Sequence, residues 1–199
     1  GLFKYRVWVE IEYFIALSQL NLPQFPAIAE NDIAFLQKIY LEFSEADAQE
    51  IKDIEKTTNH DVKAVEYFIK KQLKHTALEE YSEFVHFGLT SQDINNTAIP
   101  FSLQLGLDEV IIPAYKNILE QLNTCATLWK TIPLLSRTHG QAATPTTMGK
   151  EFAVYAERLR IQLETLINTP ISAKFGGATG AFNAHNLAFP SINWPEFGD

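Results

Sequence analysis

The sequence predicts an all-α protein in which an N-terminal helical domain precedes the first long helices of a central helical bundle. Apolar residues recur at steps of three and four along most of the 199 residues, which is the pattern of amphipathic helices. Proline and glycine clusters separate these segments. Extended structure is suggested only by the short run Ile132, Leu134, Leu135, which is too brief to predict a sheet.

The first two predicted helices lie on either side of a proline-containing break. Residues 3–20 carry charges between apolar positions that repeat with the helical period. The segment Asn21–Pro26 contains two prolines and ends this helix. A second helix is expected over residues 31–43, opened by Asn31 or Asp32.

The third and fourth helices are predicted from their caps. Ser44 is a favourable N-cap, and Asp47 lies in the first turn, where a negative charge complements the helix dipole. The charged residues that continue to Lys56 indicate a solvated face. Asn59 is expected to cap the fourth helix, which runs from about His60 to Leu73.

Two long helices are predicted in the second half. Ser91 is expected to cap a helical region over residues 92–129, whose apolar stripe is typical of near-parallel packed helices. Pro113 lies inside this region and predicts a kink. After a polar loop, a second long helix is expected to open near Thr146 and to end at Pro170.

Two long helices cannot enclose a bundle core, so this half requires further helices from missing sequence or from partner chains. No helical stripe resumes between the glycine-rich segment at residues 175–180 and Asp199. We therefore expect an N-terminal helical domain at residues 1–89. Residues 90–199 are expected to form part of a central bundle domain, with the rest of that domain and a C-terminal domain absent.

Charge and composition exclude several classes of function. A formal net charge of -8 disfavours binding to nucleic acids or anionic membranes, because phosphate contacts need a basic face. No apolar run reaches the roughly 18–20 residues of a membrane helix. The single cysteine, Cys125, excludes an internal disulfide and suggests a reducing compartment. The five histidines show no zinc-type spacing, so no metal site is predicted.

Three polar clusters lie where helices begin or a loop turns. The sequences are TTNHD at residues 57–61, HFGLTSQDINN at residues 86–96 and SRTHGQAATPTT at residues 136–147. The first two fit ordinary helix capping, and they also fit anion binding, because free N–H groups at a helix N-terminus favour a carboxylate or phosphate. His60 is read either as an exposed neighbour of the cap or as an anion ligand, and His86 either as a satisfied buried histidine or as part of a site.

The third cluster is a loop dense in functional groups that joins the two long helices. Such a loop on a rigid helical scaffold is more often functional than a plain connector. His139 follows Thr138 and precedes a glycine in this loop. Since histidine exchanges a proton near neutral pH, His139 is the best candidate for a general acid or base.

At these clusters the chain resembles the fumarase/aspartase superfamily and, within it, the adenylosuccinate lyase family of the bacterial purine-pathway type. The matching stretches are TTNHDVKAVEYF at residues 57–68, HFGLTSQDINN at residues 86–96 and PLLSRTHGQAATPTTMGKE at residues 133–151. Weaker similarity covers residues 1–10 and 174–185. The resemblance is collinear over essentially the whole chain.

The resemblance implies a carbon–nitrogen lyase that needs no cofactor. Members of this family release fumarate by β-elimination from adenylosuccinate, leaving AMP, and from a succinyl-carboxamide ribotide of purine biosynthesis. A base removes a proton beside a carboxylate, the carbanion is stabilised as an aci-carboxylate, and an acid protonates the departing nitrogen. The resemblance further implies a cytoplasmic homotetramer whose active sites are shared between subunits.

By position, His139 matches the family's catalytic histidine, the acid for the leaving nitrogen. Thr90 and Ser91 match a pair that contacts the succinyl portion of the substrate. Asn59, His60 and Asp61 match a substrate-binding stretch. His86 and Thr138 match supporting positions.

The chain also departs from the family pattern. The serine loop that supplies the catalytic base and the later phosphate-binding cations do not occur in these residues, so the chain resembles roughly the N-terminal half of such an enzyme and is expected to be inactive alone. The alternatives are a sister lyase acting on argininosuccinate or another succinyl adduct, and a non-catalytic scaffold that reuses the fold.

Overall fold

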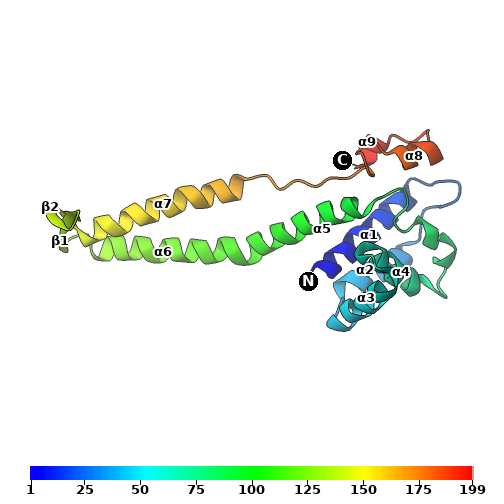
Figure 1. The fold of residues 1–199 in the computed structure, drawn as a ribbon, viewed down its shortest axis with the longest axis horizontal. Coiled ribbons are helices and arrows are strands. Elements are labelled where there is room, and N and C mark those ends of the chain that lie inside the picture. Colours follow the sequence, from blue (N-terminus) through cyan, green and yellow to red (C-terminus); the bar gives the residue numbers. More distant parts are fainter. Residues whose placement is uncertain (199) are drawn as a thin grey trace. The chain divides into compact units, whose positions relative to one another are not determined.

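The computed structural model describes residues 1–198 and confirms the predicted helical fold (Figure 1). The chain forms two compact units. The first contains residues 1–102 together with the described residues from 172 onward, and the second is Leu103–Ile171. The predicted domain division at residues 89 and 90 stays a prediction, because it concerns the organisation of a longer protein.

In the first unit, helices α2 to α4 gather around α1 (Figure 1). The bounds are α1 (Leu2–Gln19), α2 (Glu30–Leu41), α3 (Glu45–Thr58), α4 (Asp61–Leu73) and a short 3₁₀ helix, η1 (Glu79–Phe84). The apolar stripe of α1 is confirmed, since Val7, Ile11 and Phe14 are buried in one core with Phe68 of α4. The predicted break also holds, because α1 ends before Asn21.

The caps of α2 and α3 differ in how well the sequence predicted them. Ser44 caps α3, and its backbone N–H donates in return to Asp47, which completes a capping box. The prediction for α2 was wrong about the first residue of the helix and about a side chain capping it. This helix begins at Glu30 after Ala29, which has no side-chain hydrogen bond to offer, so Asn31 and Asp32 lie inside the first turn.

Two short helices follow the glycine-rich segment, where none was predicted. They are α8 (Asn183–Ala188) and α9 (Trp194–Gly198). Neither is long enough to show a periodic stripe, yet Phe182 and Trp194 are buried in the same core as α1. Tertiary burial therefore decides this segment, because its local signal is too short to be read.

Helix α5 (Ser91–Gly106) begins in the first unit and is followed by a π-helical turn, η2 (Leu107–Ile111), and by α6 (Ile112–Leu128). A kink was predicted at Pro113, and the structure has this π-helical turn just before it. Pro113 has no N–H for the usual bond to the carbonyl four residues earlier, so the wider turn comes just before it. Pro100 lies within α5 as well.

The second unit is a helical pair closed at one end by a β-hairpin (Figure 1). Helix α6 packs side by side with α7 (Met148–Asn168), and strands β1 (Pro133–Thr138) and β2 (Gln141–Thr147) connect them. The contact is close at Gly149, where a Cβ would lie 2.3 Å from the carbonyl oxygen of Ala126. No residue of α6 is buried, so within this unit the pair encloses no bundle core, as expected for two helices alone.

Within residues 1–198, none of the helices combines the length and the apolar character that a bilayer crossing requires.

Candidate active site

Helix α1 buries two oppositely charged side chains that lie one helical turn apart. Arg6 is 7% exposed and Glu10 is fully buried. The Arg6 guanidinium donates from Nη2 to Asp61 Oδ2 at 2.6 Å and from Nε to Asn95 Oδ1 at 2.9 Å. Because Asp61 begins α4 and Asn95 lies in the first turns of α5, Arg6 connects the starts of two helices that carry predicted site residues.

The TTNHD segment turns the chain from α3 into α4, and here the structure corrects the sequence prediction. Asn59 does not cap α4. It ends α3 in the left-handed conformation, with φ of 52°, which asparagine tolerates better than most residues. His60 is the N-cap of α4 instead, and its Nδ1 accepts from the backbone N–H of Lys63 at 3.1 Å. Since Nδ1 is the acceptor, Nε2 carries the proton of the neutral ring.

Asp61 is held as a carboxylate at the start of α4. Burial would raise its pKa, but the charge of Arg6 and the hydrogen bonds from Arg6 and the Val62 N–H outweigh that effect and lower the pKa. The ionised side chain also complements the positive end of the helix dipole. Arg6 therefore anchors the first residue of α4, directly after His60.

His86 bonds to the buried carboxylate of α1. Its Nδ1 lies 2.6 Å from Glu10 Oε1, and 17% of its side chain remains exposed. Burial would lower the pKa of His86, but the hydrogen bond and charge of Glu10, helped by Glu66, raise it. The ring is satisfied at one nitrogen and partly exposed, and its role in a site stays a prediction.

The start of α5 is organised by Asp93, which is fully buried. Its carboxylate accepts from the N–H of Thr90 at 2.7 Å, from Lys174 Nζ at 2.7 Å and from the N–H of Gly177 at 3.1 Å. Burial would raise the pKa of Asp93, but the hydrogen bond from Lys174 and those from Thr90 lower it. Ser91 is the first residue of α5 and not its N-cap as predicted, because Thr90 occupies the position before the helix.

A buried histidine supports the turn between His86 and Thr90. Gly88 has φ of +70°, and a Cβ there would lie 2.6 Å from the His185 ring. Tyr13 Oη lies 3.0 Å from His185 Nε2 and donates to the carbonyl of Phe87. Sequence reasoning gave His185 no role. In the structure its ring fills the space beside Gly88, so any side chain at position 88 would have to displace it.

In the second unit, His139 lies at the tip of a β-hairpin and not in the loop that the sequence predicted. Strand β1 ends at Thr138, which pairs with Gln141, so His139 and Gly140 form a two-residue turn. Both have positive φ, 48° and 77°, as a type I′ turn requires. His139 is exposed at this turn.

The structure gathers Asn59, His60, Asp61, His86, Thr90 and Ser91 in the first unit and places Thr138 and His139 in the second. Sequence reasoning missed Arg6, Glu10 and Lys174. For the first two a signal existed, because charges at both positions interrupt the otherwise apolar face of α1. For Lys174 none existed, since its partner Asp93 is distant in sequence.

Among residues 1–198, no group of three or more His, Cys, Asp or Glu side chains is arranged to hold a metal ion.

Comparison with known proteins identifies the family. A family model described as "Lyase" matches residues 1–198. The chain belongs to this lyase family. The two most specific sequence clusters of this lyase chain, at residues 86–96 and 133–151, both lie within the matched range.

Curated relatives of this lyase chain carry one name. This chain is 57% identical to "Adenylosuccinate lyase" of Dictyostelium discoideum over 206 aligned residues, and 44% identical to "Adenylosuccinate lyase" of Escherichia coli (strain K12) over 201. In both cases the match covers 100% of this chain and 44% of the relative. The lyase chain therefore spans less than half the length of these relatives.

Solved structures show the same fold at low sequence identity. A β-carboxy-cis,cis-muconate cycloisomerase from Acinetobacter calcoaceticus sp. ADP1 matches with a TM-score of 0.75 at 20% identity, over 98% of this lyase chain and 43% of that one. A fumarate lyase from Mesorhizobium sp. BNC1 matches with a TM-score of 0.73 at 21% identity, over 92% and 41%. At this identity the likeness concerns the fold alone.

Proposed function

We propose that the complete protein is an adenylosuccinate lyase, which releases fumarate from adenylosuccinate and from the succinyl-carboxamide ribotide of purine biosynthesis. The observation that carries the proposal is the 57% identity to the Dictyostelium discoideum enzyme across the whole chain. The proposed substrate and the cytoplasm as its compartment follow from that relationship. The single cysteine agrees with a reducing compartment.

In the proposed reaction a base removes a proton from the carbon beside a carboxylate, and the electron pair is held as an aci-carboxylate. The carbon–nitrogen bond then breaks, a carbon–carbon double bond forms, and an acid gives its proton to the departing nitrogen. His139 is proposed as that acid, because imidazole exchanges protons near neutral pH. The base is expected from a serine loop outside these residues.

The negative charge that develops on the carboxylate calls for fixed hydrogen-bond donors. His60 is suited to this role, because its Nδ1 is occupied by the Lys63 N–H and its Nε2–H is left to donate. Thr90 and Ser91 stand at the start of α5, where the helix dipole favours an anion. Asn59 and Asp61 are proposed as further substrate-binding residues beside His60, with His86 and Thr138 in supporting positions.

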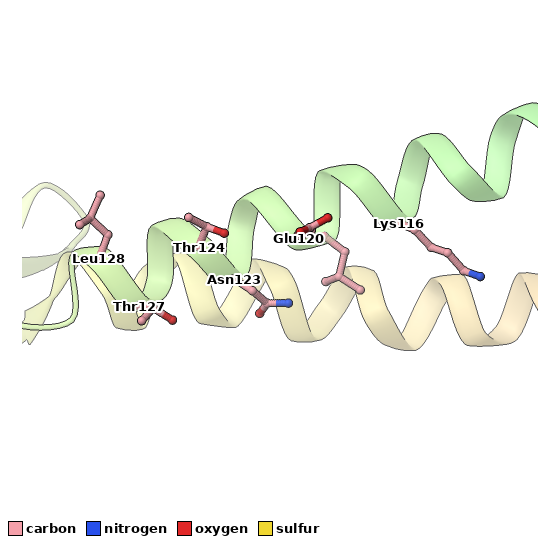
Figure 2. Close-up of a pocket in the computed structure, with 7 residues that line it drawn as sticks. Lys116, Glu120, Asn123, Thr124, Thr127 and Leu128 are labelled. Carbon is pink, nitrogen blue, oxygen red and sulfur yellow. The ribbon is translucent and has the colours of Figure 1, made fainter.

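A homotetramer with shared sites is part of the same proposal, supported by exposed apolar side chains of the second unit. Val110, Leu128 and Tyr155 are each at least 62% exposed. A hollow on this unit is lined only by residues of α6, among them Lys116, Glu120 and Leu128 (Figure 2). One face of one helix cannot enclose a substrate, so this surface fits packing against further helices better than ligand binding.

The test is to mix adenylosuccinate with the complete protein and follow the absorbance change of the purine as fumarate leaves. Conversion to AMP and fumarate is expected. If only argininosuccinate or another succinyl adduct releases fumarate, the protein is a sister lyase, and if none does, it is a non-catalytic use of the fold.

The role of His139 is tested by His139→Asn in the complete protein. Asparagine followed by glycine favours the type I′ turn, so the hairpin is retained while the imidazole is lost. Loss of a general acid should lower kcat by at least roughly 100-fold. His75→Asn is the matched control, because His75 is exposed and also has positive φ. Equal kcat in the two variants would remove His139 from the mechanism.

A further inference from the structure

The carboxylate of Glu10 lies in the core with a single hydrogen-bond partner. It is fully buried, Oε1 is 2.6 Å from His86 Nδ1, and Oε2 has no partner within residues 1–198. Burying a carboxylate costs several kcal/mol unless its oxygens are satisfied. An apolar side chain at this position of α1 would fill the core without that cost. The acid at position 10 therefore needs an explanation other than packing.

Among residues 1–198, His86 is the one side chain that bonds to this carboxylate, and its own geometry is constrained. Its φ is +64°, a conformation that costs a residue with a side chain about 1 kcal/mol or more. With Nδ1 bonded to Glu10, the ring can neither flip nor change tautomer without losing that bond. The nitrogen left for other partners is Nε2. It is not among the buried polar atoms without a partner, and 17% of the side chain is exposed.

The groups around the pair favour the charged form of His86, because the hydrogen bond and charge of Glu10 raise the pKa of the imidazole, while burial raises the pKa of Glu10 itself. Beside Glu10, His86 faces Glu66 and Lys63 of α4. Glu66 is itself paired with Lys63 at 2.8 Å and Lys70 at 3.0 Å, so Glu10 is the carboxylate that acts on the ring directly. His86 also precedes Thr90 by four residues in the turn that leads to α5. A hydrogen-bond donor at that place suits the proposed substrate, which is an anion.

We propose that Glu10 is a positioning residue for the lyase reaction. Its buried carboxylate holds the His86 imidazole at Nδ1, so that Nε2–H is presented as a fixed hydrogen-bond donor to an anionic oxygen of the substrate. The inference rests on the proposed function for the identity of the substrate, but the Glu10–His86 pair can be tested without it.

The first measurement uses the unmodified complete protein and no substrate. Diethyl pyrocarbonate acylates neutral imidazole, so the pH dependence of labelling at His86, read by peptide mass spectrometry, reports its protonation. The midpoint is expected above about 6.5, the ordinary pKa of histidine. A midpoint at or below that value, or no labelling at any pH from about 5 to 9, would overturn the proposal, because His86 would then be uncharged or closed to ligands.

The second measurement compares Glu10→Gln with Glu12→Gln. Both remove one carboxylate from α1, but Glu12 bonds to Tyr40 and Gln37 and not to a histidine. The Glu10→Gln variant should move the His86 labelling midpoint to lower pH and raise KM for adenylosuccinate by about tenfold at neutral pH, with a smaller effect on kcat. The KM difference should narrow as the pH falls and His86 regains its proton.

Equal labelling midpoints in the two variants would overturn the proposal, as would a loss in KM and kcat that does not depend on pH. If Glu10→Gln does not fold, the midpoint of the unmodified protein decides. If the unmodified protein does not cleave adenylosuccinate, the proposed function fails. The labelling result still decides whether Glu10 controls the protonation of His86.

Discussion

Removing the Asp93 carboxylate should loosen two distant segments at once. In Asp93→Ala, the N–H groups of Thr90 and Gly177 and the ammonium of Lys174 lose an acceptor that lies 2.7 to 3.1 Å away. Removing one partner of a buried ion pair costs about 3–5 kcal/mol. Since 36% of the Lys174 side chain is exposed and can be hydrated, we expect the lower end of this range, about 3 kcal/mol.

The assay is native-state hydrogen exchange of the complete protein, read on peptides that cover residues 88–96 and 174–182. A local loss of about 3 kcal/mol corresponds to roughly 100-fold faster exchange where these amides exchange by local opening. Asp53→Ala is the control, because Asp53 is an exposed aspartate of α3 bonded to Lys56. If Asp93→Ala exchanges no faster than this control at Gly177, the carboxylate does not hold the segment.

The same contacts predict an acid sensitivity. The pKa of Asp93 is lowered in the folded protein, so its contribution to stability is complete above the pKa of an unfolded aspartate, about 3.9. It is lost as the pH falls through the lowered value. The exchange difference between Asp93→Ala and the unmodified protein should therefore shrink at acid pH, and a difference that grows there would contradict the assigned charge state.

Two further substitutions test the supports of the site. Gly88→Ala forces a Cβ against the His185 ring and should cost roughly 2 kcal/mol more than Gly140→Ala, where φ is also positive but the space is open; equal melting temperatures would show that the ring yields. Arg6→Lys keeps the charge beside Asp61 but loses the planar guanidinium that makes two bonds at once, so KM for adenylosuccinate should rise by about tenfold; an unchanged KM in steady-state kinetics would show that this connection does not position the substrate site.

The sequence predicted the long helices well because each of them repeats one apolar stripe over many turns. It did not predict the β-hairpin at β1 and β2, because the strands are short and largely exposed. The turn signal was present in His139 followed by Gly140, but histidine is not the residue that normally announces a type I′ turn. The cap of α4 was misplaced by one residue, since asparagine is both a good N-cap and a good left-handed C-terminal residue, and only the backbone decides between them.

In the candidate site, too, the sequence predicted some features and the tertiary structure alone decided others. The residue types and spacing of TTNHD, HFGLTSQDINN and SRTHGQ indicated helix starts and turns, because these are local properties. The resemblance of the same segments to known sequences indicated the lyase family and made His60, Thr90 and His139 candidates. The bonds from Arg6 to Asp61, from Glu10 to His86 and from Lys174 to Asp93 were decided only by the tertiary structure. Each joins segments that are 55 or more residues apart, and no local pattern states which buried charge will meet which partner.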